Sequence, residues 1–236
     1  TLMRSSAASD VYKRQVYEAI EAIDLEDTEL LKEELGDVLL QIIFHCRIEE
    51  EKSCFDFDDI CDELCKKLII RHPHVFGDIT VSDSGEVLKN WDSIKKETKG
   101  QTSYTETLTS VAKSLPALMR AQKVGKRAMR AGMDFSCVSD AVERVKSETD
   151  ELEEAIRSGK KDDIYEELGD LLFSCVNTAR HLNIDAEEAL TRATEKFIER
   201  FAETEDLVRL DGADMKALSI DQLDVYWNKV KRRAED

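Results

Sequence analysis

Carboxylate side chains spaced one helical turn apart are the residues of this sequence best suited to chemistry. Glu148 and Glu151 form one such pair, and Glu167 and Asp170 form another. A spacing of three residues puts both members of a pair on one face of a helix. Two antiparallel helices that face each other through these pairs bring four carboxylates together, and hard divalent cations prefer oxygen ligands. The pattern predicts a site for Mg²⁺, with Mn²⁺ as the alternative ion.

The competing interpretation of any single pair is a solvated helix face. Aspartate and glutamate make up 51 of the 236 residues, so pairs spaced by three also arise by chance. The flanking sequence favours a site, because Asp170 lies at the edge of an apolar face formed by Leu168, Leu171, Leu172 and Val176. Gly169 within a helix costs about 1 kcal/mol relative to alanine, which suggests that another helix or a ligand approaches closely there.

The acidic sequence occurs twice. The segment from Glu33 to Asp37 returns unchanged from Glu166 to Asp170, and further matches on both sides keep the same offset without a gap. Each copy is followed by a Lys/Arg pair and then a Trp/Lys pair, both spaced by four: Lys67 with Arg71 and Trp91 with Lys95 in the first half, Lys196 with Arg200 and Trp227 with Lys231 in the second. This order indicates a duplicated helical unit.

The cations of the second half have two interpretations. Lys196 and Arg200 share a helix face, where they either pair with neighbouring glutamates or, beside a metal site, bind the oxygens of a polyphosphate. Trp227 and Lys231 either anchor the last helix to the core or take part in base stacking and phosphate binding. Their position in the repeat favours a functional role for Lys196 and Arg200, whereas both interpretations remain open for Trp227 and Lys231.

The composition limits the classes of partner. A formal charge of −17 and a pI near 4.8 argue against binding a nucleic acid polymer, because phosphate backbones are bound by basic surfaces. No apolar run approaches the roughly 18 residues needed to span a membrane. The six cysteines form no Cys-x-x-Cys pair and mostly lie in apolar-periodic stretches. These features predict buried, reduced thiols in a cytoplasmic protein.

The fold is expected to be all-α, because two prolines, nine glycines and few alternating β-branched runs leave little room for a sheet. Apolar periodicity predicts helices joined by short turns in antiparallel bundles. They cover residues 16–23, 28–51, 56–71, 115–131, 139–156, 162–181, 185–207 and a last helix from 220. Residues 77–85 are expected to be a loop.

The expected organisation has four parts. Residues 1–14 lack clear apolar periodicity and a match in the second unit, so they are expected to be a non-native leader joined to an incomplete first helix. An N-terminal repeat is expected at 15–99, a linker and connecting helix at 100–135, of which 100–109 is a polar linker, and a C-terminal repeat at 136–236.

The motifs of both halves resemble the MazG family of nucleoside triphosphate pyrophosphohydrolases. In the second half they are Glu148-x-x-Glu151, Glu167-x-x-Asp170 within Glu-Glu-Leu-Gly-Asp-Leu-Leu-Phe, the segment from Asn177 to Leu182, and Glu195-Lys-Phe-x-x-Arg200-Phe. In the first half they are Tyr17-Glu18, Glu34-Leu-Gly-Asp37, Arg71-His-Pro-His-Val-Phe76 and Trp91-x-x-Ile-Lys95. The resemblance extends from about Val16 to Lys231.

This resemblance implies two tandem MazG-like helical-bundle repeats that form a homodimer and convert a nucleoside triphosphate to the monophosphate and pyrophosphate with Mg²⁺. By matching position, the implied metal ligands and catalytic carboxylates are Glu148, Glu151, Glu167 and Asp170. Lys196 and Arg200 are implied to be catalytic and nucleotide-binding. The other implied nucleotide contacts are Arg144, Trp227 and Lys231.

The first repeat departs from the family pattern at Gln15, where the family places the first glutamate of its Glu-x-x-Glu motif. An amide does not supply the charge of a carboxylate ligand, so the first repeat retains at most Glu18, Glu34 and Asp37. We therefore predict that the second repeat carries the activity.

Two alternatives remain open from the sequence alone. One is an enzyme restricted to a single non-standard nucleotide or to a phosphoribosyl nucleotide. The other is a non-catalytic acidic helical protein that binds a divalent cation and associates with other proteins. The second alternative gives no reason for Lys/Arg and Trp/Lys pairs to follow each acidic unit.

Overall fold

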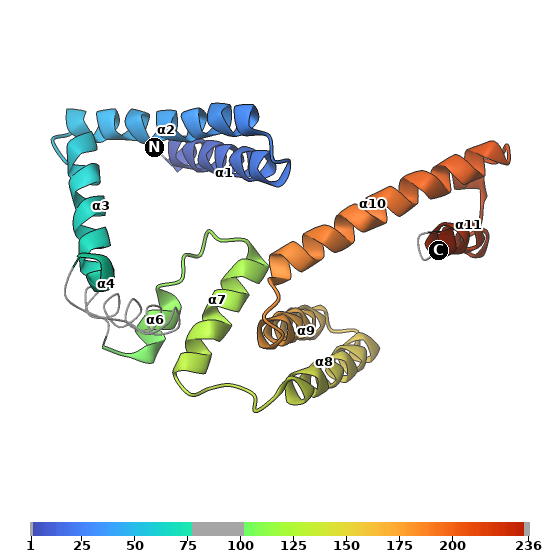
Figure 1. Ribbon diagram of the computed structural model, residues 1–236. Helices are drawn as coiled ribbons and strands as arrows, with labels where there is room; N and C mark the ends of the chain where they lie inside the picture. The colour runs from blue at the N-terminus through green and yellow to red at the C-terminus, as the bar shows by residue number, and fades with distance from the viewer. Residues whose placement is uncertain (1, 77–101, 234–236) are drawn as a thin grey trace. The chain divides into compact units, whose positions relative to one another are not determined.

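The computed structural model describes residues 2–76 and 102–233, and every regular element in these ranges is helical (Figure 1). The all-α prediction is therefore confirmed for the described residues. The chain divides into two compact units, residues 1–99 and 100–236. The predicted loop at 77–85 and the predicted pair Trp91 and Lys95 lie outside the described residues.

The first unit consists of α1 (Leu2–Asp24), α2 (Thr28–Glu51), α3 (Phe57–Arg71) and the short α4 (Pro73–Phe76). A tight turn joins α1 to α2, and the Asp27 side chain caps α2 by accepting hydrogen bonds from its first amides. These two helices pack on each other around Ala19, Ala22 and Cys46. Residues 2–14, predicted to be a leader, continue into the rest of α1 without a break.

The helix α3 begins at a reciprocal capping box between Asp56 and Asp59, as the acidic residues there predict. It ends at Arg71, and Pro73 then starts α4, where a missing amide N–H removes no helical hydrogen bond.

The second unit consists of α6 (Tyr104–Thr109), α7 (Ala117–Arg130), α8 (Val138–Ser158), α9 (Lys161–His181), α10 (Ala186–Leu210), a 3₁₀ turn η1 (Met215–Ala217) and α11 (Ile220–Arg233). The helices α8 and α9 form an antiparallel hairpin, which turns at Gly159 with a φ of +71°. The helix α7 packs against α9 of this hairpin. Separately, α11 packs against α10.

The start of α10 is tied to α7 by Gln122. Its buried amide donates to the carbonyl of Ile184 at 2.8 Å and accepts from the backbone N–H of Ala186 at 3.0 Å. Glu187 also accepts from the backbone of Met119 at 3.2 Å. These contacts fix where α10 leaves the α7–α9 layer, and Figure 1 shows α11 packed near its other end.

Two local predictions were wrong, and a third was wrong in part. The expected linker at 100–109 contains α6, because Ser103 and Glu106 form a capping box. Only Cys46 is buried among the six free cysteines, because α3, which carries Cys61 and Cys65, has little packed against it. At Gly169 a Cβ atom would meet nothing within 4 Å, so no described helix approaches it closely, and the alternative, a ligand at this glycine, stays a prediction.

No helix in the described ranges is both long enough and apolar enough to cross a membrane.

Candidate metal and nucleotide site

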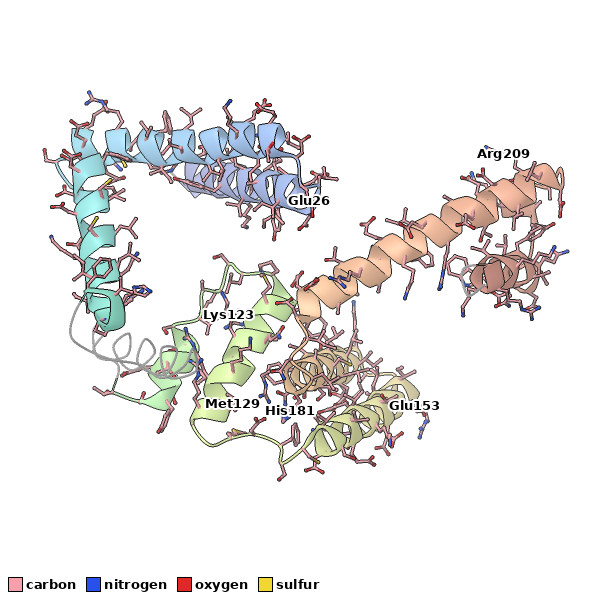
Figure 2. The ribbon with its side chains drawn as sticks, viewed as in Figure 1. Glu26, Lys123, Met129, Glu153, His181 and Arg209 are labelled. Carbon is pink, nitrogen blue, oxygen red and sulfur yellow. The ribbon has the colours of Figure 1, made fainter. Side chains whose placement is uncertain are left out.

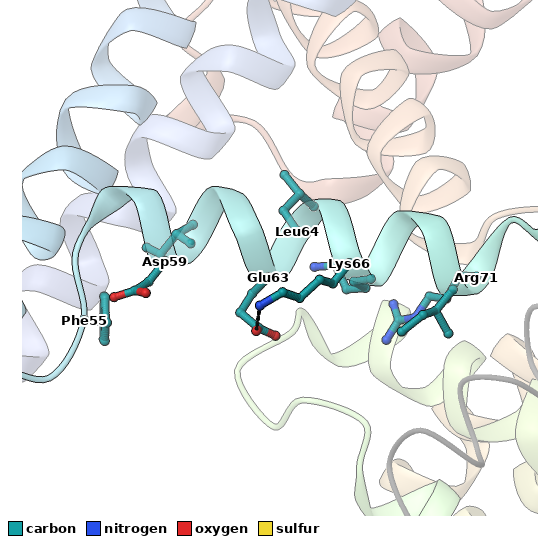
Figure 3. Close-up of a pocket in the computed structure, with 9 residues that line it drawn as sticks. Phe55, Asp59, Glu63, Leu64, Lys66 and Arg71 are labelled. Atoms are coloured by element: carbon teal, nitrogen blue, oxygen red, sulfur yellow. Dashed lines mark hydrogen bonds and ion pairs between the residues drawn. The ribbon is translucent and has the colours of Figure 1, made fainter. Parts of the chain in front are cut away.

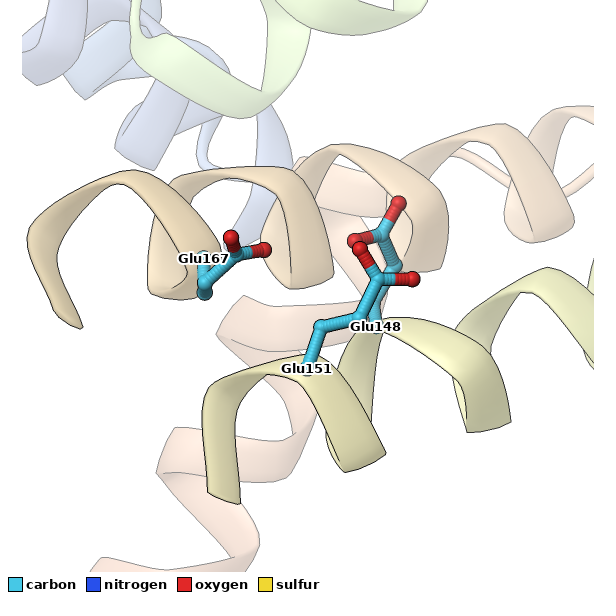
Figure 4. Close-up of side chains that lie close together, drawn as sticks. All are labelled: Glu148, Glu151 and Glu167. Atoms are coloured by element: carbon cyan, nitrogen blue, oxygen red, sulfur yellow. The ribbon is translucent and has the colours of Figure 1, made fainter. Parts of the chain in front are cut away.

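Three of the predicted carboxylates meet between α8 and α9. Glu148 and Glu151 project from α8 toward Glu167 on α9, and one oxygen of each lies within 4.8 Å of the others (Figure 4). The antiparallel hairpin produces this convergence, because the i, i+3 spacing puts Glu148 and Glu151 on the face of α8 that α9 covers. The cluster therefore has the oxygen donors and the spacing expected for a divalent cation.

Glu148 is the most buried member of the cluster, with 3% of its surface exposed. Its Oε1 lies 2.7 Å from Nε of Arg144 and accepts a hydrogen bond from the Ser174 hydroxyl at 3.4 Å. Its Oε2 is buried and has no hydrogen-bond partner among the described residues. A buried carboxylate oxygen without a partner is unfavourable, and a bound cation would satisfy it. The residues present therefore fit a divalent metal ion.

The other two glutamates are partly exposed. Glu151 accepts from the Ser147 hydroxyl at 2.8 Å and from Arg144 at 3.3 Å. The pKa of Glu167 is raised above its usual value by burial first, and then by the negative charges of neighbouring carboxylates, Glu151 foremost. This electrostatic strain is of the kind that a bound cation relieves.

The fourth predicted ligand, Asp170, lies at the edge of the cluster. Its side chain is exposed, and it does not belong to the group of three that meets within 4.8 Å. Its negative charge nevertheless contributes to the raised pKa of Glu167.

The predicted nucleotide contacts lie on three helices. Arg144 is within the cluster on α8, whereas Lys196 and Arg200 lie on α10 and Trp227 and Lys231 on α11. The rings of Phe197 and Trp227 are 5.2 Å apart, so Trp227 contributes to the packing of α11 on α10. In the part of the chain that the structure describes, no hydrogen bond or ion pair joins Lys196, Arg200 or Lys231 to the three glutamates.

A cavity of about 520 Å³ borders the cluster within the second unit. Its wall includes Glu148 of the cluster and Arg144, which pairs with Glu148. The rest is mainly apolar and comes from α6, α7, α9 and the loop after α7: Leu108, Val124, Gly125, Ala128, Met133, Asp134, Phe135, Phe173, Ser174 and Asn177. The size and the lining suit a small organic ligand.

An ionic network around the buried Arg180 holds the loop after α7 against α9. The guanidinium of Arg180 pairs with both carboxylate oxygens of Asp134, and His181 Nε2 lies 2.9 Å from Asp134 Oδ1. Figure 2 shows Met129 and His181, which approach this network from α7 and α9. The hydrogen bond from Arg180 is the main cause that keeps the pKa of Asp134 below its usual value. No functional role was predicted for these residues from the sequence, although Arg180 and His181 belong to a motif quoted above.

In the first unit, the positions equivalent to the carboxylate cluster contain the amide of Gln15 beside Glu18 and Asp37. The Gln15 amide, 7% exposed, donates hydrogen bonds to Glu18 and, at 3.3 Å, to Asp37. Burial raises the pKa of Glu34, with the charges of Glu18 and Asp37 adding to the effect. Among the described residues, no group of three carboxylates meets here as in the second unit.

The predicted cations Lys67 and Arg71 line an open groove of about 870 Å³ along α3 (Figure 3). All of its lining residues come from α3 or from Phe55 just before it. The groove contains Asp59 and Glu63, but in the described part of the chain they belong to no group of carboxylates close enough to hold a metal ion.

Comparison with known proteins agrees with a duplicated domain. The sequence pattern of the MazG nucleotide pyrophosphohydrolase domain matches residues 11–76 and again residues 138–203. The chain is 42% identical to the nucleoside triphosphate pyrophosphohydrolase of Escherichia coli (strain K12), over 94% of this chain and 85% of that protein. It is also 42% identical to the nucleoside triphosphate pyrophosphohydrolase/pyrophosphatase MazG of Thermotoga maritima, over 92% of this chain and 82% of that protein. The chain is 29% identical to the nucleoside triphosphate pyrophosphohydrolase of Mycolicibacterium smegmatis, over 94% of this chain and 62% of that protein. The chain belongs to the MazG family of nucleotide pyrophosphohydrolases.

Proposed function

We propose that the second unit hydrolyses nucleoside triphosphates to nucleoside monophosphate and pyrophosphate with Mg²⁺. The observation that carries this proposal is the group of Glu148, Glu151 and Glu167, with an unpartnered carboxylate oxygen on its buried member. The names of the relatives, which are nucleoside triphosphate pyrophosphohydrolases, support the same reaction.

The three glutamates, with Asp170 beside them, would hold the metal. When bound, Mg²⁺ neutralises phosphate charge and lowers the pKa of a coordinated water. The Arg144 guanidinium keeps the Glu148 carboxylate in place and balances part of the cluster's negative charge. The cavity beside Glu148 has room for the nucleoside of the substrate, whose triphosphate would then lie over the carboxylates.

The bond broken is the one between the α-phosphorus and the oxygen that bridges to the β-phosphate. A water oxygen joins the α-phosphorus, and pyrophosphate leaves with the electron pair of the broken bond. Because pyrophosphate carries concentrated negative charge, its departure needs cations close by. Lys196, Arg200 and Lys231 are the side chains proposed to supply these cations.

We infer that a second copy of the chain brings those cations to the carboxylates. Among the described residues of one chain, no hydrogen bond or ion pair joins these cations to the three glutamates, although Lys196 and Arg200 share a helix face. Large apolar side chains are exposed on both helices concerned: Leu168, Leu172 and Phe173 on α9, and Leu190, Phe197, Ile198 and Phe201 on α10. A homodimer that pairs α10 of one copy with the hairpin of the other would bury these side chains and complete the site.

Product analysis tests the reaction directly. The purified chain is incubated with each nucleoside triphosphate, Mg²⁺ and ¹⁸O-labelled water, and the products are identified by ³¹P NMR and mass spectrometry. The proposal predicts monophosphate that carries one ¹⁸O atom and unlabelled pyrophosphate. Diphosphate and orthophosphate as products would contradict it, and Mg²⁺ binding without turnover would favour the non-catalytic alternative.

Replacing the metal tests the cofactor. Turnover is expected to require Mg²⁺, with Mn²⁺ able to substitute, because both ions accept six oxygen ligands at short distances. Unchanged turnover in the presence of excess chelator would contradict a metal-dependent site.

A further inference from the structure

The amide of Asn177 is held in one orientation by Arg180. The Arg180 Nε–H donates to Asn177 Oδ1 at 2.8 Å. A guanidinium carries only donors, so the atom of Asn177 that faces it must be the oxygen. The amide nitrogen, Nδ2, therefore points away from Arg180.

Arg180 itself has little freedom to move. Its side chain is 5% exposed, and its two terminal nitrogens bind the Asp134 carboxylate. Gly125 of α7 lies over the bond to Asn177: a Cβ atom there would meet Arg180 Nε at 3.4 Å and Asn177 Oδ1 at 3.5 Å. This packing and pairing keep the Asn177 amide from turning over, because a flip would set two donors against each other.

Asn177 also lines the cavity that borders the carboxylate cluster. In the described ranges, no residue accepts a hydrogen bond from its Nδ2. Among the other polar side chains of the wall, Ser174 and Arg144 donate to Glu148, and Asp134 accepts from Arg180. The Asn177 amide nitrogen is therefore a neutral donor available to a ligand, in a wall that is otherwise largely apolar.

We propose that Asn177 selects the nucleobase by donating a hydrogen bond to a carbonyl oxygen on its ring. The inference rests on the proposed function, since it assigns the cavity to the base of the substrate. An asparagine amide pairs with adenine through both of its atoms, with the oxygen accepting from the 6-amino group. In this protein the oxygen is already bound by Arg180. The cavity therefore favours purines with a 6-carbonyl, such as hypoxanthine and guanine, over adenine.

The physical basis of the selectivity is the conflict between donors. An adenine in the same position turns its 6-amino group toward the Asn177 amide nitrogen, and both groups can only donate. A site built to bond one group rejects the analogue that lacks it, because buried polar atoms are left without partners. We expect a preference of about tenfold or more for ITP over ATP, since one such mismatch has roughly that effect on binding.

The test compares ITP and ATP, which differ in the group at position 6 and in the proton on N1. The ratio of their kcat/KM values is measured for the unmodified protein, for Asn177→Asp and for Asn177→Ala. Asn183→Asp makes the same chemical change in the turn after α9 and serves as the control. Binding of IMP and AMP is measured in parallel by calorimetry, and circular dichroism confirms that each variant folds.

The proposal expects ITP to be favoured by the unmodified protein and by Asn183→Asp. In Asn177→Asp the amide donor is replaced by an acceptor, so the ratio should fall at least tenfold, through KM. In Asn177→Ala it should approach one. An unmodified protein with no preference for ITP would overturn the proposal, as would a preference that survives in both Asn177 variants.

Failure of the proposed function would look different. In that case the unmodified protein releases no pyrophosphate from any nucleotide, and the binding ratio of IMP to AMP decides the inference alone. Tighter binding of IMP that is lost in the Asn177 variants would support the carbonyl-reading role. Equal binding, or binding of neither nucleotide, would overturn it.

Discussion

Arg144 forms an ion pair with one of the two carboxylate oxygens of the buried Glu148. Arg144 Nε lies 2.7 Å from Oε1, whereas Oε2 is buried with no partner in the described part of the chain. The two oxygens of Glu148 therefore have separate roles, one fixed by the protein and one available to a cation. This asymmetry distinguishes Glu148 from the many acidic residues on solvated helix faces.

Removing the charge of Glu148 should abolish metal-dependent activity. In Glu148→Gln, one of the two polar atoms becomes a donor, which repels the cation and leaves Arg144 less neutralised. We expect activity to fall at least about 100-fold, as is typical for loss of a group that acts in the transition state. The rise in melting temperature on adding Mg²⁺ should also disappear.

Glu153→Gln is the matched control, because Glu153 is exposed on the same helix and, among the described residues, pairs with Arg157 alone. It should keep activity within about twofold, since exposed ion pairs contribute little. Equal losses in the two variants would show that general damage to α8, and not metal binding, explains the result.

Mixing two inactive variants tests whether the site is shared between chains. Glu167→Gln lacks a carboxylate of the hairpin, and Lys196→Ala lacks a cation of α10. If each site takes its cation from the partner, mixed dimers contain one intact site, and random pairing restores about a quarter of the unmodified activity. The measurement is pyrophosphate release after the two variants are unfolded and refolded together. No recovery in verified mixed dimers would contradict a shared site.

The Asp134–Arg180 pair should make the second unit sensitive to acid. The folded-state pKa of Asp134 is lowered, mainly by its hydrogen bond from Arg180. Its stabilisation is therefore fully present above the unfolded-state value and is lost as the pH falls through the folded-state pKa. Asp134→Asn should lose this pH dependence and should be less stable at neutral pH, because the buried Arg180 guanidinium loses its counter-ion.

Urea unfolding followed by circular dichroism at a series of pH values provides the measurement for Asp134. Asp150→Asn, an exposed position on α8, is the control and should follow the unmodified protein throughout. A parallel acid profile for Asp134→Asn and the unmodified protein would rule out this pair as the source.

Gln15 accounts for part of the difference between the two units. Its amide donates to Glu18 and Asp37, where a glutamate would add a negative charge. We expect Gln15→Glu to raise Mg²⁺ affinity in the first unit, measured by calorimetry in a Glu167→Gln background that silences the second. Adding Glu34→Gln should remove the gain. Unchanged affinity in Gln15→Glu would show that this one charge is not what the first unit lacks.

The sequence predicted the helices well because their signals are local. The spacing of apolar residues, the caps at Asp27 and Asp56 and the left-handed turn at Gly159 act over a few residues. The convergence of Glu148 and Glu151 with Glu167 was also predictable, because two helices joined by a short turn pack antiparallel.

Other features depend on contacts between distant segments and were not predicted. The ion pair between Asp134 and Arg180 joins residues far apart in the sequence, and it forms only when the loop after α7 folds back on α9. The hydrogen bond from Arg180 to Asn177 depends on this arrangement, because Asp134 holds the Arg180 side chain in place. The exposure of the cysteines depends on how many helices cover α3, which periodicity does not specify. The α6 helix was missed because its Ser-x-x-Glu signal precedes only six helical residues.

The most direct test of the account compares pyrophosphate release by the unmodified chain, Glu167→Gln and Glu34→Gln, with Mg²⁺ and a panel of nucleoside triphosphates. Glu167 and Glu34 occupy equivalent places in the two units, and the pKa of each is raised mainly by burial. If the active site lies in the second unit, Glu167→Gln loses the activity and Glu34→Gln retains it. Activity that survives in Glu167→Gln but is lost in Glu34→Gln would contradict an active site in the second unit.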